Sequence, residues 1–66
     1  MQIAVNGRAT QVVDGTSLPA LVEQLGLRVG SVVVEHNGTA LLRSELVAAV
    51  LAEGDRVELV RAVAGG

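Results

Sequence analysis

The sequence predicts a small α+β domain in which one amphipathic helix packs across one face of a mixed β-sheet. Short segments with alternating or β-branched residues occur on both sides of a single stretch with helical periodicity. Two Asn-Gly pairs separate strand-like segments, which is typical of tight hairpins. With 66 residues, the chain is long enough for one small hydrophobic core and for one domain at most.

The N-terminal segment predicts a β-hairpin. Residues 2–5 alternate in polarity, as a half-buried strand does. Asn6-Gly7 favours a type I′ turn, because both residue types accept a positive φ. Residues 9–13 are expected to return as a second strand, which ends at Asp14-Gly15.

The next segment predicts the main helix. Thr16-Ser17 supplies an N-cap, and Pro19 falls in the first turn, where its missing N–H costs nothing. Gly26 is suited to end the helix. Four apolar residues recur with helical spacing and predict the buried face: Leu18, Leu21, Val22 and Leu25.

The remainder of the chain predicts three more strands. Residues 27–31 are expected to form a loop before the β-branched run Val32-Val33-Val34, which predicts a strand to His36, buried on both faces if it lies inside the sheet. Asn37-Gly38 then indicates a second hairpin with a return strand over residues 39–42.

Residues 43–51 fit a short helical or 3₁₀ segment. After a turn at residues 53–55, the alternation over residues 56–61 predicts the last strand.

The predicted order β-β-α-β-β-β allows the first and last strands to lie side by side, which is the β-grasp (ubiquitin-like) arrangement. We expect one domain over residues 1–63 and a flexible C-terminal tail over residues 64–66. The helix face should pack on a core that contains Ile3, Val5, Val33 or its neighbours, Val57 and Leu59.

Composition excludes several classes of function. The chain has no cysteine and no aromatic residue, carries a net charge of −2, and spreads its five cationic residues, all arginine, along the sequence. Nucleic-acid binding is therefore not expected. The longest wholly apolar run, residues 46–52, is too short to span a membrane. No export signal is recognisable at the start, so a cytoplasmic location is expected.

No set of side chains predicts catalysis or a metal site. His36 is the single histidine and, at a strand end beside a turn, is expected to be a solvated surface residue. The serines fit caps or loops, and the acidic residues Asp14, Glu53 and Asp55 flank turns. We therefore expect no catalytic residue, no metal and no bound cofactor.

The segment Val63-Ala64-Gly65-Gly66 is the most distinctive part of the chain. Two glycines without side chains make a thin terminal thread that ends in an α-carboxylate, and such a thread can enter a narrow slot in another protein. The alternative is an end that is merely frayed.

Taken with this terminus, the chain resembles the ubiquitin-like sulfur carriers of the ThiS/MoaD superfamily, and within them the ThiS-type carriers of thiamin biosynthesis. The resemblance covers essentially the whole chain. The stretches that carry it are Met1-Gln2-Ile3, Asn6-Gly7, Leu21-Val22, Leu25, Val34-Glu35-His36-Asn37-Gly38, Arg43, Glu53-Gly54-Asp55-Arg56-Val57-Glu58-Leu59-Val60 and Ala64-Gly65-Gly66. One departure is Ala62-Val63, where related chains often carry an aromatic residue.

The resemblance implies a carrier and not an enzyme. An E1-like adenylyltransferase (ThiF-type) would use ATP to convert the Gly66 carboxylate to an acyl-adenylate, and sulfur would displace AMP to give a thiocarboxylate. Val63, Ala64 and Gly65 would be inserted into the partner. The acceptor of the sulfur would be thiazole synthase (ThiG-type).

Two alternatives stay open. One is a related carrier with another acceptor, namely the small subunit of molybdopterin synthase or a carrier for other thiolations. The second is a non-catalytic β-grasp interaction module, which would tolerate added C-terminal residues whereas a carrier would not.

Overall fold

The computed structural model describes residues 1–61. In chain order, its elements are β1 (Gln2–Val5), β2 (Arg8–Gln11), α1 (Leu18–Gln24), the 3₁₀ helix η1 (Val29–Ser31), β3 (Val32–His36), β4 (Thr39–Ala40), α2 (Arg43–Ala48) and β5 (Arg56–Arg61). They form a five-stranded sheet in the order β2-β1-β5-β3-β4. β1 and β5 are parallel, and the neighbouring pairs are antiparallel. The predicted contact between the first and last strands is confirmed.

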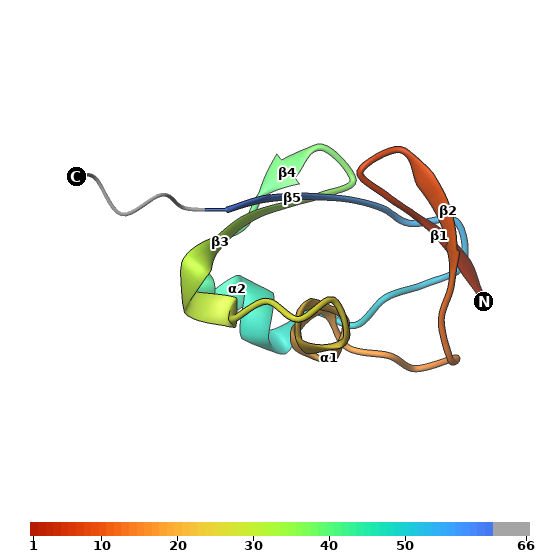
Figure 1. Ribbon diagram of the computed structural model, residues 1–66, viewed down its shortest axis with the longest axis horizontal. Helices are drawn as coiled ribbons and strands as arrows, with labels where there is room; N and C mark the ends of the chain where they lie inside the picture. Colours follow the sequence, from red (N-terminus) through yellow and green to blue (C-terminus); the bar gives the residue numbers. More distant parts are fainter. Residues whose placement is uncertain (62–66) are drawn as a thin grey trace.

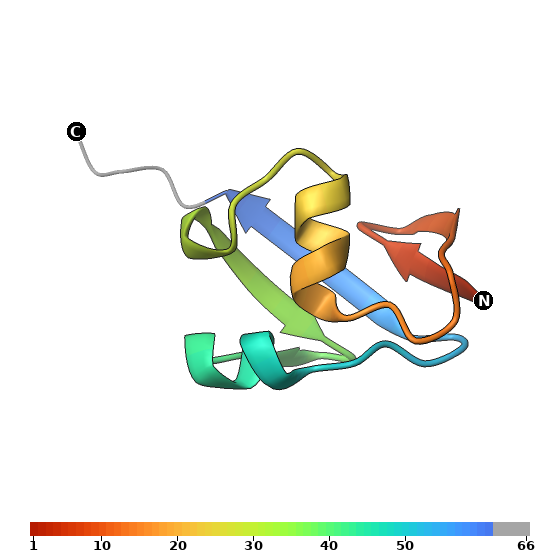
Figure 2. The same cartoon turned by 90° about the horizontal axis from the view of Figure 1, so that it is seen from below.

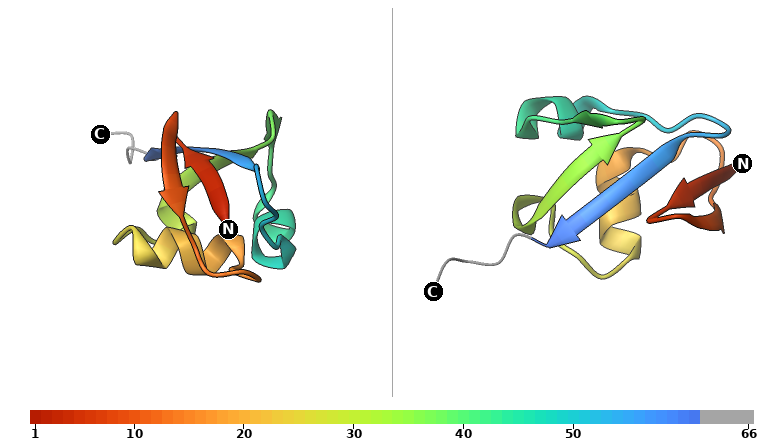
Figure 3. Two further views of the ribbon diagram at one scale, coloured as in Figure 1. Left: turned by 90° about the vertical axis from the view of Figure 1, so that its right-hand side faces the viewer. Right: turned by 90° about the horizontal axis from the view of Figure 1, so that it is seen from above.

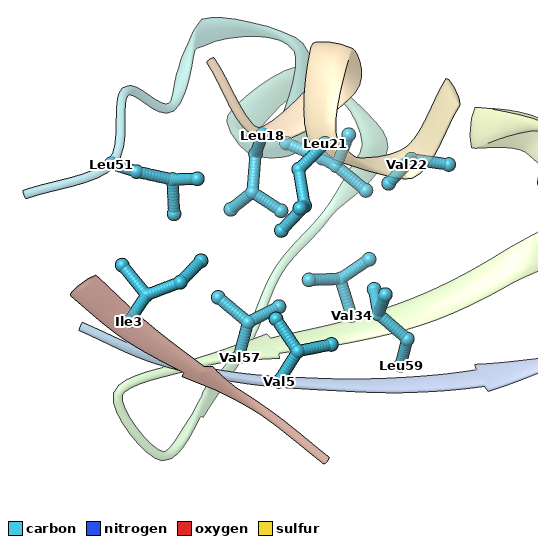
Figure 4. Packing of buried hydrophobic residues seen from close by; sticks show 10 residues of the cluster. Ile3, Val5, Leu18, Leu21, Val22, Val34, Leu51, Val57 and Leu59 are labelled. Atoms are coloured by element: carbon cyan, nitrogen blue, oxygen red, sulfur yellow. The ribbon is translucent and has the colours of Figure 1, made fainter. Parts of the chain in front are cut away.

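Both α-helices lie on one side of the sheet, and the opposite face of the sheet carries no helix (Figure 1). In Figure 2, which shows the molecule from below, α1 lies in front of the sheet and crosses its strands at an angle. Figure 4 shows side chains of α1 pointing toward those of β1, β3 and β5. The buried core consists of Ile3, Val5, Leu18, Leu21, Val22, Val34, Leu46, Leu51, Val57 and Leu59.

The ends of α1 follow the predicted capping chemistry. The Ser17 hydroxyl accepts a hydrogen bond from the Ala20 N–H at 3.1 Å. At the other end Gly26 has φ +77°, and the N–H groups of Gly26 and Leu27 bond back to the carbonyls of Glu23 and Val22. This is a Schellman motif, which needs a residue that tolerates the left-handed region.

The prediction that Leu25 belongs to the buried face is wrong. Leu25 is the C-cap residue of α1 and is 43% exposed. Because the helix ends at Gln24, the chain turns away from the sheet before the fourth apolar position of the periodic pattern reaches the core.

The prediction that β3 is buried on both faces also fails. β3 lies inside the sheet, between β5 and β4, yet Val33 is 52% exposed whereas Val34 is 1% exposed. Helices cover one face only, so the alternation along the strand sends Val33 to the open face.

Several element bounds differ from the prediction, including that of the second helix, which ends at Ala48 rather than at residue 51. β2 ends at Gln11 and β4 at Ala40, so Val13 and Leu42 are exposed. The expected loop before β3 contains η1. The predicted short helical segment is confirmed as α2, at whose start the Glu45 carboxylate accepts the Leu42 N–H at 2.7 Å.

Candidate functional site

β5 is the strand that leads directly into the predicted tail. The predicted site residues Val63, Ala64, Gly65 and Gly66 lie outside the described residues. What the structure describes is the support from which they continue. β5 is the central strand of the sheet, between β1 and β3 (Figure 3), and its inward side chains Val57 and Leu59 are buried in the core.

Two asparagines of the hairpin turns hold β5 from both sides. Asn6 Oδ1 accepts the Leu59 N–H at 2.7 Å. Asn37 Oδ1 accepts the Arg56 N–H at 2.8 Å, and the Asn37 N–H donates to the Arg56 carbonyl at 2.8 Å. Both asparagines have the positive φ expected for their turns. The turn signal explains their backbone conformation, but it gave no sign of these long-range side-chain bonds.

His36 is not the solvated surface residue that its position predicts. Its side chain is 20% exposed, and Nε2 donates to Asp55 Oδ2 at 2.8 Å. The same carboxylate accepts the Ala52 N–H at 2.9 Å and the Asn37 side-chain amide at 3.1 Å. Asp55 therefore does more than flank a turn. It ties the end of β3 to the segment before β5.

These contacts decide the protonation of Asp55. Burial raises the pKa of the carboxyl group, but the hydrogen bonds from His36, Ala52 and Asn37 together lower it by more, so the pKa lies below its ordinary value. Asp55 is therefore ionised at neutral pH. The hydrogen bonds that the Asp55 carboxylate accepts all come from this domain, so they stabilise the fold.

An open cleft lies beside η1, with a volume of about 560 Å³. Its lining includes Glu23, Arg28, Gly30, Ser31 and Arg43. The Ser31 hydroxyl bonds back to the Arg28 carbonyl at 2.9 Å, which fixes the turn that carries Arg28. The sequence does not predict this cleft, because Arg28 and Arg43 are 15 residues apart: Arg28 precedes η1, and Arg43 begins α2.

The open face of the sheet presents a second group of side chains. The register of β3 and β5 places Val33 opposite Val60 and Glu35 opposite Glu58. Val33 and Val60 are 52% and 62% exposed. Two apolar side chains and two carboxylates thus lie next to each other on the face that no helix covers.

Within residues 1–61, no group of three or more His, Cys, Asp or Glu side chains is placed to hold a metal ion. None of the helices in this part of the chain is long and apolar enough to cross a membrane.

A central C-terminal strand, parallel to the first strand and covered on one face by a helix, defines a β-grasp domain of the ubiquitin-like class. Comparison with known proteins narrows this class to one family. The model of the ThiS family matches residues 2–66, and the chain belongs to that family.

Solved structures and a curated protein agree with this assignment. The crystal structure of the thiamine biosynthesis protein ThiS from Geobacter metallireducens superimposes with a TM-score of 0.83 at 30% identity, over the full length of both chains. Its NMR solution structure gives 0.81 at 30% identity, over all of this chain and 88% of the other. A thiazole synthase from Magnetococcus marinus is 36% identical over all 66 residues, which span 20% of that longer protein.

Proposed function

We propose that this chain is a sulfur carrier of thiamin biosynthesis, whose Gly66 carboxylate is the group that is activated and thiolated. The observation that carries the proposal is the match to the ThiS family over residues 2–66, which includes the terminal Gly-Gly. The full-length structural similarity to a ThiS protein supports it.

The chemistry needs a partner enzyme, because a carboxylate is a poor electrophile. In the first step, which takes place on an E1-like, ThiF-type enzyme, a carboxylate oxygen of Gly66 attacks the α-phosphorus of ATP. Pyrophosphate leaves from that phosphorus, and the acyl-adenylate forms. In the second step a sulfur nucleophile attacks the acyl carbon, and AMP leaves with the former carboxylate oxygen. The product is a thiocarboxylate on Gly66, and ATP is consumed by the partner.

The composition of the chain suits this reaction. It contains no lysine and no cysteine. The activated acyl group therefore meets no side-chain amine or thiol of its own chain, and arginine is a poor nucleophile because it stays protonated.

We propose a ThiG-type thiazole synthase as the sulfur acceptor. The support is the 36% identity to a segment of a protein named thiazole synthase, in which a domain of this kind shares one polypeptide with a larger remainder. Molybdopterin synthase and other thiolation systems are the acceptors to test against it.

Intact-protein mass spectrometry tests the proposal after incubation with ATP, sulfide and a ThiF-type enzyme. The wild type should gain the mass of one oxygen-to-sulfur exchange. Deletion of Gly66 moves the carboxylate by one residue, about 3.3–3.6 Å, and a misplacement of about 1 Å can cost roughly a hundredfold in rate. The truncated chain should therefore stay unmodified while its thermal midpoint is unchanged.

A variant with one residue added after Gly66 tests the same requirement from the opposite direction. It keeps both glycines but carries the carboxylate on the added residue, and it should be equally inactive. If either tail variant is thiolated as fast as wild type, the carrier function is wrong and the domain is an interaction module.

A further inference from the structure

The Arg43 guanidinium lies in the space beside Gly30 that a larger residue at position 30 would share. A Cβ built on Gly30 would lie 2.8 Å from Arg43 Nη2 and 3.5 Å from its Cζ. Gly30 does not have a positive φ, so its backbone does not require glycine. The missing side chain instead lets the Arg43 guanidinium rest against the backbone of η1, at the wall of the cleft.

The charge in this cleft is not balanced within the domain. Among residues 1–61, neither Arg28 nor Arg43 has a carboxylate within 4 Å. Glu23 is the acidic residue in the lining, so two guanidinium groups face one carboxylate. Arg43 is also the first residue of α2, the helix end at which a cation is unfavourable. Helix stability therefore does not explain its charge.

The cleft lies at the end of the domain from which the tail continues. Arg61, the last residue of β5, is opposite Val32, which directly follows η1. Figures 2 and 3 show the end of β5 beside the start of β3. The five residues 62–66 can span at most about 17–18 Å. Any protein that acts on the Gly66 carboxylate must therefore bring its surface to this end of the domain.

We propose that the cleft of Arg28 and Arg43 is a docking site for carboxylate side chains on the adenylating enzyme that takes up the tail. The inference rests on the proposed function. A guanidinium group binds a carboxylate through two parallel hydrogen bonds, which fixes orientation as well as position. Adenylation requires the tail to enter the enzyme, which brings the surface of the enzyme to the end of the domain where Arg28 and Arg43 lie. Thiazole synthase as the occupant is the alternative that the test below separates.

The other charges of the domain favour an encounter through the arginine cleft. The chain carries a net charge of −2, and the open face presents Glu35 opposite Glu58. An acidic partner surface is repelled by that face and attracted by the arginine cleft, so the electrostatic field presents the tail end of the carrier first.

The test measures the steady-state kinetics of adenylation with a ThiF-type enzyme, for wild type and for the variants Arg28→Gln, Arg43→Gln and the double variant. We expect the double variant to raise KM for the carrier by about tenfold with kcat unchanged, because rim charges act on encounter and dissociation. The ratio to wild type should shrink as salt rises from about 0.05 to 0.5 M, because salt screens exposed charges.

Arg8→Gln is the matched control, since Arg8 begins β2 in the first hairpin, and KM should be unchanged. Thermal midpoints show whether each variant is folded. If the double variant is unfolded, Arg28→Gln alone decides, because the contacts of Arg28 described in the turn come from its backbone carbonyl.

An unchanged KM in the folded variants, or an equal rise with Arg8→Gln, would overturn the inference while a thiolated wild type keeps the proposed function. A rise confined to the reaction with thiazole synthase would also overturn it, because the occupant would then be the wrong enzyme. Absence of thiolation in wild type would instead reject the proposed function itself.

Discussion

The two faces of the sheet differ sharply although they share the same strands. Val34 and Val33 are neighbours in β3, yet the first is 1% exposed and the second 52%. The face that holds Val34 packs against α1, whereas the other face is open (Figure 1). The covered face holds the domain together. The side chains of the open face are largely exposed and contribute less to the stability of the isolated domain.

The first prediction concerns a substitution that creates a cavity on the covered face. Leu21→Ala should lower the free energy of unfolding by about 2–5 kcal/mol, because it removes a side chain that is 1% exposed and leaves a cavity between α1 and the sheet. Urea unfolding monitored by circular dichroism measures this change. Since small domains have only a few kcal/mol to lose, much of the protein should be unfolded at room temperature.

Leu25→Ala is the matched control on the same helix segment. It deletes the same atoms from a side chain that is 43% exposed, so its cost should stay below about 1 kcal/mol. Equal effects of the two substitutions would contradict the assignment of the helix face.

The second prediction concerns the polar rim of the covered face, where β3 ends at His36. Asp55→Asn should lower the free energy of unfolding at pH 7 by about 1–3 kcal/mol, because the carboxylate accepts bonds from His36, Ala52 and Asn37. The pKa of Asp55 is lowered in the folded state. Its contribution is therefore present above the unfolded pKa of about 3.9 and is lost as pH falls through the lower folded value.

The difference between wild type and Asp55→Asn should accordingly narrow between pH 5 and pH 2, as the wild-type carboxyl becomes protonated. Denaturant unfolding at a series of pH values follows it. A difference that stays constant over this range would mean that the charge of Asp55 does not stabilise the domain.

Local patterns predicted the covered face well and the partners of polar side chains poorly. Alternation identified Ile3, Val5, Val57 and Leu59, and helical spacing identified Leu18, Leu21 and Val22, because burial of a face imposes a period that a single segment displays. The run Val32-Val33-Val34 has no such alternation. The sequence therefore could not say which valine faces α1.

Side-chain contacts between distant segments leave no periodic signal. The asparagine of each Asn-Gly pair was fully explained by the turn, and its bond to β5 depends on which strand lies beside it. His36 and Asp55 are 19 residues apart, and Gly30 and Arg43 come from different elements. Only the assembled sheet brings these residues together. Residues 62–66, including the predicted reactive Gly66, lie outside the described residues, so their role remains a sequence prediction and the proposal built on it.

The last and smallest prediction concerns the open face. Glu35 and Glu58 lie directly opposite each other, and among residues 1–61 no cation lies within 4 Å of either carboxylate. Like charges in this arrangement are destabilising. Glu58→Gln should therefore raise the free energy of unfolding by about 0.2–1 kcal/mol, and Glu35→Gln should raise it by a similar amount.

The double variant separates this repulsion from a general effect of charge. Either single substitution removes the repulsive pair, so the second should add little, and the two increases should not sum. Urea unfolding of the four proteins gives the coupling free energy, which should also shrink at high salt. Strictly additive increases would show that the two carboxylates do not interact across the strands, and a loss of stability in both single variants would show that the open face contributes to the fold as the covered face does.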